Sequence, residues 1–303
     1  MAPSPRDASP ELQQAMEECA NEVNASIHAL LPKADTPEAP LYDAMRAGVL
    51  GGGKRLRPFL LMQSAKLFGV DSDRARRVAA AIECVHSYSL IHDDLPAMDN
   101  ADLRRGKPTI HKQFDEATAI LAGDALLTLA FEILASPETH EDPRVRCELV
   151  LQMAQASGGH GLCGGQMLDL IGEKQEFDVG TISRLQRMKT GKLIALACES
   201  GAILGKTDEA HRRALRNYAY DLGLAFQVTD DLLDVEGDVS ETGKAVGKDA
   251  DAHKSTFVST LGVEMARQRA QMLVQQAVQH LKVFEGRAKM LEEMAYYVLE
   301  RRA

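Results

Sequence analysis

The strongest constraint in this sequence is a helical periodicity that runs through almost its whole length. In AAAIECVHSYSLIHDD, Ala81, Val85, Tyr88 and His92 follow the i, i+4, i+7, i+11 spacing of one helical face. Other stretches rich in Ala and Leu, such as ATAILAGDALLTLAFEILA and KTGKLIALACESGAILG, have the same character, and alternating runs of β-branched residues are missing. The sequence therefore predicts an all-α fold with roughly ten or more helices.

Clusters of Gly and Pro break these helical stretches, but no linker rich in Pro, Gly and Ser divides the interior. A chain of 303 residues can bury a substantial core. The N-terminal stretch MAPSPRDASP contains three prolines and no apolar segment, which indicates a frayed tail and not a signal peptide. We expect a flexible tail at residues 1–10 and one domain over residues 11–303.

The composition of the chain limits which partners it can bind and indicates the cellular compartment in which it works. The formal net charge of -9 argues against a broad nucleic-acid-binding surface. The sequence has no uninterrupted apolar run of about 18 residues, so we expect no membrane span. The five cysteines are scattered and form no C-x-x-C pair, which is typical of reduced thiols in a cytoplasmic protein. An acidic protein that binds an anion also needs local basic clusters, a bridging cation, or both.

Six aspartates fall in two clusters that each follow an apolar helical run: Asp93, Asp94 and Asp99, then Asp230, Asp231 and Asp234. In the second cluster, Asp230 and Asp234 share one helix face. In the first, a bend at Pro96 could return the third carboxylate toward the other two. One Asp-Asp pair alone is more often a solvated helix end. Two clusters after buried helices favour an oxygen-only site for a hard cation, magnesium or manganese.

Basic residues accompany these clusters. In GGGKRLRP, Lys54 and Arg57 follow three glycines at an expected helix start, where free N–H groups favour an anion, although a flexible turn before a basic helix explains the pattern equally well. Arg104 and Arg105 could bind diphosphate oxygens bidentately. His86 lies nearly on the same helical face as the first aspartates. It could donate a hydrogen bond to a phosphate, or it could be a core histidine. The residues alone therefore indicate a site for a metal and a phosphate.

An ordered set of motifs adds a family resemblance. GGGKRLRP, HSYSLIHDDLPAMDNADLRRGKPT, GGQMLDL, KTGKL, GLAFQVTDDLLDVEGD and HKST occur in the order found in trans-isoprenyl diphosphate synthases. From about residue 40 to 303, the chain resembles the short-chain bacterial type that makes farnesyl diphosphate. The resemblance implies helices around a deep central cavity, a homodimer, and small isoprenyl diphosphates as substrates. It also implies three Mg²⁺ ions per active site, which Mn²⁺ can replace.

The resemblance assigns roles by position. It implies that the metal is held by Asp93, Asp94, Asp99, Asp230, Asp231 and Asp234. It implies that isopentenyl diphosphate is bound by Lys54, Arg57, His86 and Arg105. It implies that the allylic diphosphate is bound by Arg104, Lys189, Thr190, Gln227, Lys244 and Lys254. It implies catalytic roles for Asp93, Asp94, Asp99, Arg104, Lys189, Asp230 and Lys244. Arg301 and Arg302 resemble a basic tail that can cover the site.

The implied reaction is a magnesium-dependent head-to-tail (1'-4) condensation of isopentenyl diphosphate with dimethylallyl and geranyl diphosphate, which gives (2E,6E)-farnesyl diphosphate. Tyr88, five positions before the first aspartate motif, and its neighbour Ser89 are expected to limit product length, although Tyr88 could also be a simple core residue. A geranylgeranyl or geranyl diphosphate synthase is the alternative with identical chemistry. A class I terpene cyclase, a non-catalytic prenyl synthase subunit and a helical binding protein are remoter, because both aspartate motifs are present and the chain has no Trp.

Overall fold

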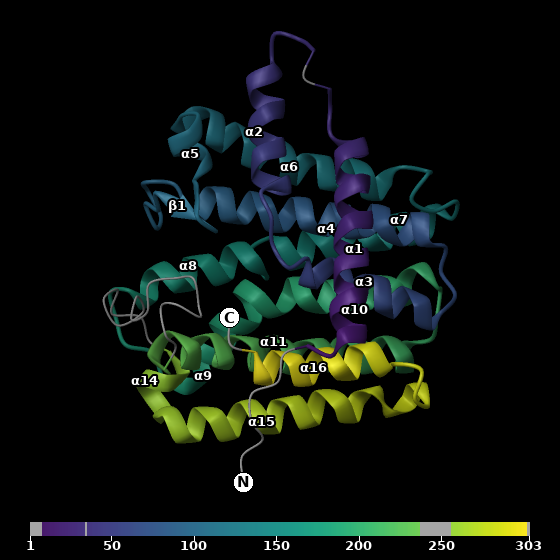
Figure 1. Cartoon of the computed structure of the whole chain (residues 1–303), viewed down its shortest axis with the longest axis vertical. Helices are drawn as coiled ribbons and strands as arrows, with labels where there is room; N and C mark the ends of the chain where they lie inside the picture. The colour runs from purple at the N-terminus through teal and green to yellow at the C-terminus, as the bar shows by residue number, and fades with distance from the viewer. Residues whose placement is uncertain (1–7, 34, 237–255, 302–303) are drawn as a thin grey trace.

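The computed structural model describes residues 8–33, 35–236 and 256–301, and it confirms the all-α prediction (Figure 1). The α-helices are α1 (Pro10–Leu30), α2 (Ala39–Leu50), α3 (Leu56–Leu67), α4 (Ser72–Asp93), α5 (Ile110–Gln113), α6 (Glu116–Ala135), α7 (Pro143–Ser157), α8 (Leu162–Gly172), α9 (Val179–Gln186), α10 (Lys192–Leu204), α11 (Glu209–Glu236), α14 (Phe257–Leu261), α15 (Val263–His280) and α16 (Lys289–Glu300). The other described elements are a π-helical turn η1 (Arg187–Gly191), a 3-10 helix η2 (Leu281–Phe284), and the strands β1 (Leu103–Arg104) and β2 (Lys107–Pro108).

Short polar side chains set the starts of several helices. Asp71 accepts hydrogen bonds from the first backbone N–H groups of α4, and Asp115, Asp142 and Asp178 do the same for α6, α7 and α9. Helix α1 begins at Pro10, behind a capping serine, so the tail and domain bounds placed at residues 10 and 11 stay a prediction.

The core is built around α10, in which every residue from Leu193 to Leu204 is buried. This helix is mostly apolar, as expected for a helix surrounded by others, and it contacts α3, α4, α7 and α11. Gly201 lets α10 approach α3 closely, because a Cβ at this position would lie 2.4 Å from the backbone nitrogen of Ala65. Helices α11, α15 and α16 pack together at the lower side of the molecule (Figure 1).

One helix among the described residues, α6, is long and apolar enough to cross a membrane by length and composition alone. Its Ala122, Leu126 and Ala130 are fully buried, and the helix packs against α2, α4 and α7. The core helix of a globular protein meets the same criterion. The expectation of no membrane span therefore stays a prediction, with this packing in its support.

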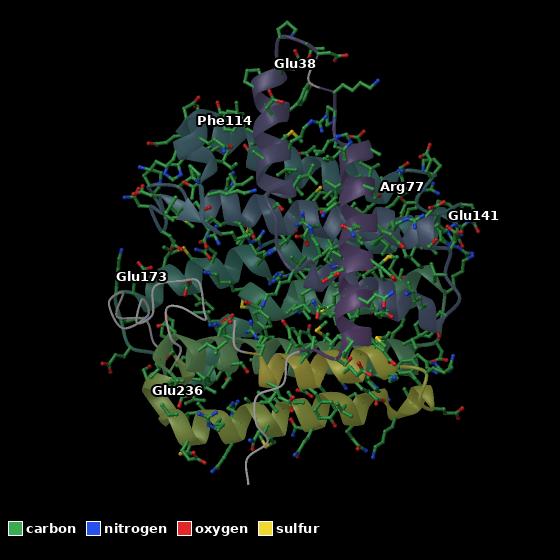
Figure 2. All side chains as sticks on the ribbon, viewed as in Figure 1. Glu38, Arg77, Phe114, Glu141, Glu173 and Glu236 are labelled. Atoms are coloured by element: carbon green, nitrogen blue, oxygen red, sulfur yellow. The ribbon has the colours of Figure 1, made fainter. Side chains whose placement is uncertain are left out.

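Helix ends gather at one edge of the molecule. The C-terminal end of α4 leads toward β1 on the side where α8 also lies (Figure 1). Glu173, just after α8, and Glu236, the last residue of α11, lie at this same edge (Figure 2). The fold thus brings the two aspartate-rich helix ends, far apart in sequence, to one side of the helical bundle.

Candidate active site

The first aspartate cluster lies where α4 ends and the chain turns back. Asp99 N donates to the carbonyl oxygen of Asp93 at 2.9 Å, and Ala101 N donates to that of Asp94 at 3.1 Å. The turn that follows Pro96 therefore returns Asp99 to the end of the helix that carries the first two aspartates. These backbone bonds also satisfy carbonyl groups that a helix end leaves without partners.

Arg104 binds the buried carboxylate of Asp94. Its Nε and Nη2 lie 2.8 and 2.7 Å from the two oxygens, as in a two-pronged ion pair. The β1–β2 hairpin holds this arginine, and its central residues Arg105 and Gly106 both have positive φ, 53° and 73°. Two such residues in a two-residue hairpin are typical of a type I′ turn. This hairpin is a departure from the all-α prediction. Its turn lets Arg104 bind Asp94 while the next residue, Arg105, binds the carbonyl of Gly52.

Helix α8 and the π-helical turn η1 form a second wall. Gln166 Nε2 donates to Asp93 Oδ1 at 2.6 Å, and Lys189 Nζ donates to Asp169 Oδ2 at 2.5 Å. Gly165 permits this approach, because a Cβ there would lie 2.3 Å from the backbone nitrogen of Lys189. A π-helical turn widens the backbone locally and is frequent at functional sites. Burial raises the pKa of Asp93, and the charge of Lys189 partly offsets this.

Gln166 and Asp169 were given no role by the sequence. They lie in GGQMLDL, and their i, i+3 spacing places both on one face of α8. The signal was present as an amide and a carboxylate at helical spacing beside a Gly-Gly pair. Their partners, Asp93 and Lys189, come from other elements, so only the packed structure identifies them.

A cavity of about 380 Å³ lies between α3, α4, α8 and η1. The predicted site residues that line it are Arg57, His86, Tyr88, Ser89, Asp93, Lys189 and Thr190. Leu162, Met167 and Leu170 of α8 supply apolar wall. The cavity therefore combines an ionic region with an apolar one, as a site for a diphosphate with a hydrocarbon tail requires.

The basic residues near α3 form a compact group. Arg57 Nη1 lies 3.4 Å from His86 Nε2, and Arg57 Nε is buried without a hydrogen-bond partner. Arg105 donates to the carbonyl of Gly52 and lies against Gly53, where a Cβ would collide with its guanidinium. Burial, with the charges of Arg57 and three other arginines, holds the pKa of His86 well below 6.5, so its ring is neutral at pH 7. The group is strongly cationic and suits an anion.

The second aspartate cluster lies on α11 and has several protein partners. Asp230 accepts a 2.6 Å hydrogen bond from Arg301, whose guanidinium stacks on the ring of Phe226. Asp231 accepts from Gln227 Nε2 at 3.1 Å and from the backbone N–H of Phe257, the first residue of α14, at 2.9 Å. Asp231 is thus buried against α14 in this structure, while Asp230 is half exposed at its carboxylate.

Among the described residues, no three Asp, Glu, His or Cys side chains converge closely enough to hold one metal ion. The six aspartates are therefore not gathered into one closed cage here. The donor set still fits a hard cation, because it consists of carboxylate oxygens and because magnesium usually takes only a few protein ligands and completes its shell with water and substrate phosphates. The metal-ligand roles stay a prediction, as do those of Lys244, Lys254 and Arg302, which lie outside the described residues.

Lys54 directly follows the glycine run, three residues before Arg57. Partial burial lowers the pKa of Lys54. The positive charge of Arg301 lowers this pKa further, and the negative charge of Asp230 raises it. Lys54 is therefore within electrostatic reach of the second aspartate cluster. The loop before α3 thus connects the cationic group with α11.

The model of the Polyprenyl synthetase family matches residues 38–295 of the chain. The chain belongs to this family. The resemblance to trans-isoprenyl diphosphate synthases is thereby confirmed. This family member is 44% identical over 295 residues to the farnesyl diphosphate synthase of Escherichia coli (strain K12), across 95% of the chain and 98% of that relative. It is 46% identical over 277 residues to the farnesyl diphosphate synthase of Haemophilus influenzae, across 90% of the chain and 92% of the relative.

Solved structures agree with the fold. An FPP/GFPP synthase from Zymomonas mobilis is 48% identical and superposes with a TM-score of 0.87, across 95% of this chain and 99% of that one. A geranylgeranyl pyrophosphate synthetase from Pyrococcus horikoshii is 30% identical, also with a TM-score of 0.87, across 96% and 98% of the two chains. The chain therefore shares the helical fold of these solved prenyl diphosphate synthases.

Proposed function

We propose that this member of the polyprenyl synthetase family is a prenyltransferase that condenses isopentenyl diphosphate with dimethylallyl and geranyl diphosphate to give (2E,6E)-farnesyl diphosphate. The observation that carries the proposal is the cavity. It is lined by apolar residues of α8, by Asp93 and Lys189, and by Arg57 and His86. Two basic groups beside one apolar pocket match two diphosphate substrates whose hydrocarbon ends must meet.

In the proposed mechanism, Lys189 and Thr190 bind the diphosphate of the allylic substrate at the α8–η1 wall, and Arg104 is placed to assist from the hairpin. The six aspartates would hold Mg²⁺, three ions per site that Mn²⁺ would replace, and the metal would stabilise the departing pyrophosphate. Lys189 contributes a fixed positive charge where negative charge develops on that leaving group. The allylic C–O bond then ionises.

The second substrate is bound by the cationic group of Arg57, His86 and Arg105, which orients its double bond toward the allylic carbon. The double bond attacks that carbon, and a proton is lost, with the released pyrophosphate as the acceptor. The apolar wall of α8 excludes water, which would otherwise trap the cation as an alcohol.

Product length is assigned to Tyr88. The residue is 6% exposed, its hydroxyl oxygen lies 3.2 Å from Cys163 Sγ, and its ring meets that of His92 edge-on at 5.5 Å between centroids. Ser89 lines the same cavity and donates to the carbonyl of His86. These contacts hold an aromatic ring one turn below the first aspartates. Such a ring would stop chain growth at fifteen carbons.

A geranylgeranyl or geranyl diphosphate synthase is the second candidate, since it needs only a different cavity depth. A geranylgeranyl diphosphate synthase of Cyanophora paradoxa is 40% identical over 262 residues. The deciding experiment incubates the protein with Mg²⁺, isopentenyl diphosphate and either dimethylallyl or geranyl diphosphate. Chromatography of the dephosphorylated products should show the C15 alcohol as the main product. A C20 or C10 main product would establish the second candidate, and no consumption of isopentenyl diphosphate would contradict both.

We also propose a homodimer, in line with the family resemblance. The surface formed by α6 and α7 exposes large apolar side chains, with Ile120 at 44%, Leu121 at 56% and Leu151 at 54%. Exposed apolar surface of this kind on a soluble helical protein is typical of an interface between subunits. Light scattering should give a mass about twice the 33.0 kDa of one chain.

Leu121→Glu should convert the dimer to a monomer, because a charge at the centre of an apolar interface is strongly unfavourable. Val283→Glu is the matched control, since Val283 is similarly exposed at 43% but lies on η2, away from α6 and α7. A dimer that persists in Leu121→Glu, or a monomeric wild type, would exclude this interface.

A cytoplasmic location, and small-molecule substrates as the partners besides a second copy of the chain, complete the proposal. All five cysteines are free, and burial raises the pKa of the thiols of Cys19 and Cys84 to about 12. Buried thiols of this kind are unreactive packing groups, and unpaired cysteines suit a reducing compartment. The acidic net charge of -9 supports the expectation that the protein does not bind nucleic acid.

A further inference from the structure

Arg55 has an unusual combination of backbone and side-chain geometry. It precedes α3 with φ of 49°, in the left-handed region that side chains other than glycine rarely adopt. Its side chain is 1% exposed, even though the residue directly follows the exposed Gly52, Gly53 and Lys54. A strained and buried arginine of this kind persists only when the contacts around it are strong.

Three contacts surround the Arg55 guanidinium, each from a different helix. Nε donates to Asn24 Oδ1 of α1 at 2.9 Å, Nη1 donates to Glu83 Oε1 of α4 at 2.6 Å, and Nη2 donates to the carbonyl of Val49 in α2 at 2.6 Å. The planar fork of an arginine fits such divergent acceptors, whereas a lysine offers one charged point. The loop before α3 is thereby attached to α1, α2 and α4 at once.

This loop carries two of the residues proposed to bind isopentenyl diphosphate. Lys54 precedes Arg55 directly, and Arg57 follows two positions later in the first turn of α3. Before Lys54, Gly52 and Gly53 have φ of 107° and 124°. Glycine adopts many backbone conformations with similar ease, so these two residues do not by themselves fix the loop. The position of Lys54 and Arg57 therefore depends on the side chain between them.

Arg55 also neutralises Glu83. This carboxylate is 3% exposed and lies near two other cations, since its charge raises the pKa values of Arg57 and Arg105 against the lowering that burial causes. The hydrogen bond to Glu83 comes from Arg55. Because Arg55 forms this bond, Arg57 can face the cavity and His86, and Arg105 can lie over the glycine run.

We propose that Arg55 is a positioning residue for the isopentenyl diphosphate site: its buried contacts with Asn24, Glu83 and Val49 fix the loop so that Lys54 and Arg57 reach the same diphosphate. The inference rests on the proposed function, because it assumes that these residues bind that substrate. Arg55 does not touch the substrate. Its effect is selective for one of the two substrates, which a general stabilising role would not be.

The test uses the double variant Arg55→Met/Glu83→Met, measured by steady-state kinetics with each substrate varied in turn. Removing both charges leaves neither Arg55 nor Glu83 as a buried ion without its partner, so the variant should fold, and the net charge near Arg57 is unchanged. The displaced loop should raise KM for isopentenyl diphosphate about tenfold, because small displacements of binding groups have large effects. KM for geranyl diphosphate and kcat at saturation should change less than about twofold.

Asn24→Ala provides a second variant that removes one acceptor without altering any charge, and it should raise the same KM about twofold to threefold. Glu199→Gln is the matched control: Glu199 is a buried carboxylate bound by Arg212 and Arg216, remote from the glycine loop. It should lower the unfolding temperature without a selective change in KM.

Wild-type values of KM for isopentenyl diphosphate in both Arg55→Met/Glu83→Met and Asn24→Ala, or equal rises for the two substrates, would overturn the inference. These outcomes are distinct from failure of the proposed function, which the wild-type protein would show by not consuming isopentenyl diphosphate. Calorimetric binding of isopentenyl diphosphate to each folded variant gives a readout that does not depend on turnover. The affinity for isopentenyl diphosphate should fall most in the variant whose KM rises most.

Discussion

Asp93→Asn should lower kcat by about 10³-fold, because loss of several kcal/mol of leaving-group stabilisation corresponds to a factor of this size. The substitution preserves shape, and the amide oxygen can still accept from Gln166 Nε2, which lies 2.6 Å from Asp93 Oδ1. What it removes is the negative charge proposed to hold Mg²⁺ against the diphosphate. Asp230→Asn should have an effect of similar size from the other wall, where the carboxylate is partly exposed.

Asp93→Asn should lower activity without lowering the stability of the protein. Burial raises the pKa of Asp93, which means that the folded protein disfavours its charged form. A neutral amide should therefore leave the unfolding temperature unchanged or raise it, as is typical where a functional site is held at a cost in stability. At Asp230, loss of the 2.6 Å ion pair with the nearly buried Arg301 should lower stability instead.

Asp102→Asn is the control for these variants. Asp102 lies in the same segment as the first motif, but its carboxylate is exposed and pairs with Lys112 at 2.9 Å. Its kcat should stay within about twofold of wild type, as for most surface substitutions. Thermal unfolding by circular dichroism and kcat at saturating substrate and metal are the measurements. Near-normal turnover in folded Asp93→Asn would contradict the assignment of this carboxylate to the metal.

Tyr88→Ala should change the main product from C15 to C20 and longer prenyl diphosphates. The side chain lines the cavity, and α4 and α8 hold it from two sides through His92 and Cys163. Removing the ring opens space for a further isoprene unit, while the ionic residues that carry the chemistry stay in place. The total rate of isopentenyl diphosphate consumption should therefore change far less than the product distribution does.

Two companion variants separate the ring from its hydroxyl. Tyr88→Phe keeps the ring and loses the 3.2 Å contact with Cys163 Sγ, so it should still give mainly C15 if bulk limits the chain. Tyr42→Ala, a half-buried tyrosine of α2 outside the cavity, should leave the product unchanged. Chromatography of dephosphorylated products measures all three. An unchanged chain length in Tyr88→Ala would show that Tyr88 is simply a packed core residue.

Some of the structure followed directly from local sequence patterns. The 3.6-residue periodicity of the segment through Tyr88 and His92 predicted α4, and the Asp-Asp pair was correctly placed at its end. Such patterns are reliable because a long amphipathic or buried helix satisfies its own backbone hydrogen bonds and needs few distant partners to be recognised. The β1–β2 hairpin was missed, because strands of two residues have no periodicity and Arg105 is an unusual residue at positive φ.

The sequence by itself determined the helical class, the order of the motifs and the residue types available for binding a cation and two diphosphates. Tertiary structure alone decided which groups meet. Arg104 binds Asp94, Lys189 binds Asp169, and Arg55 binds Glu83, although nothing in the spacing of any of these pairs specifies it. The physical reason is that an ionic contact depends on the three-dimensional approach and burial of two side chains, which helix packing sets, whereas periodicity reports only which face of a helix is apolar.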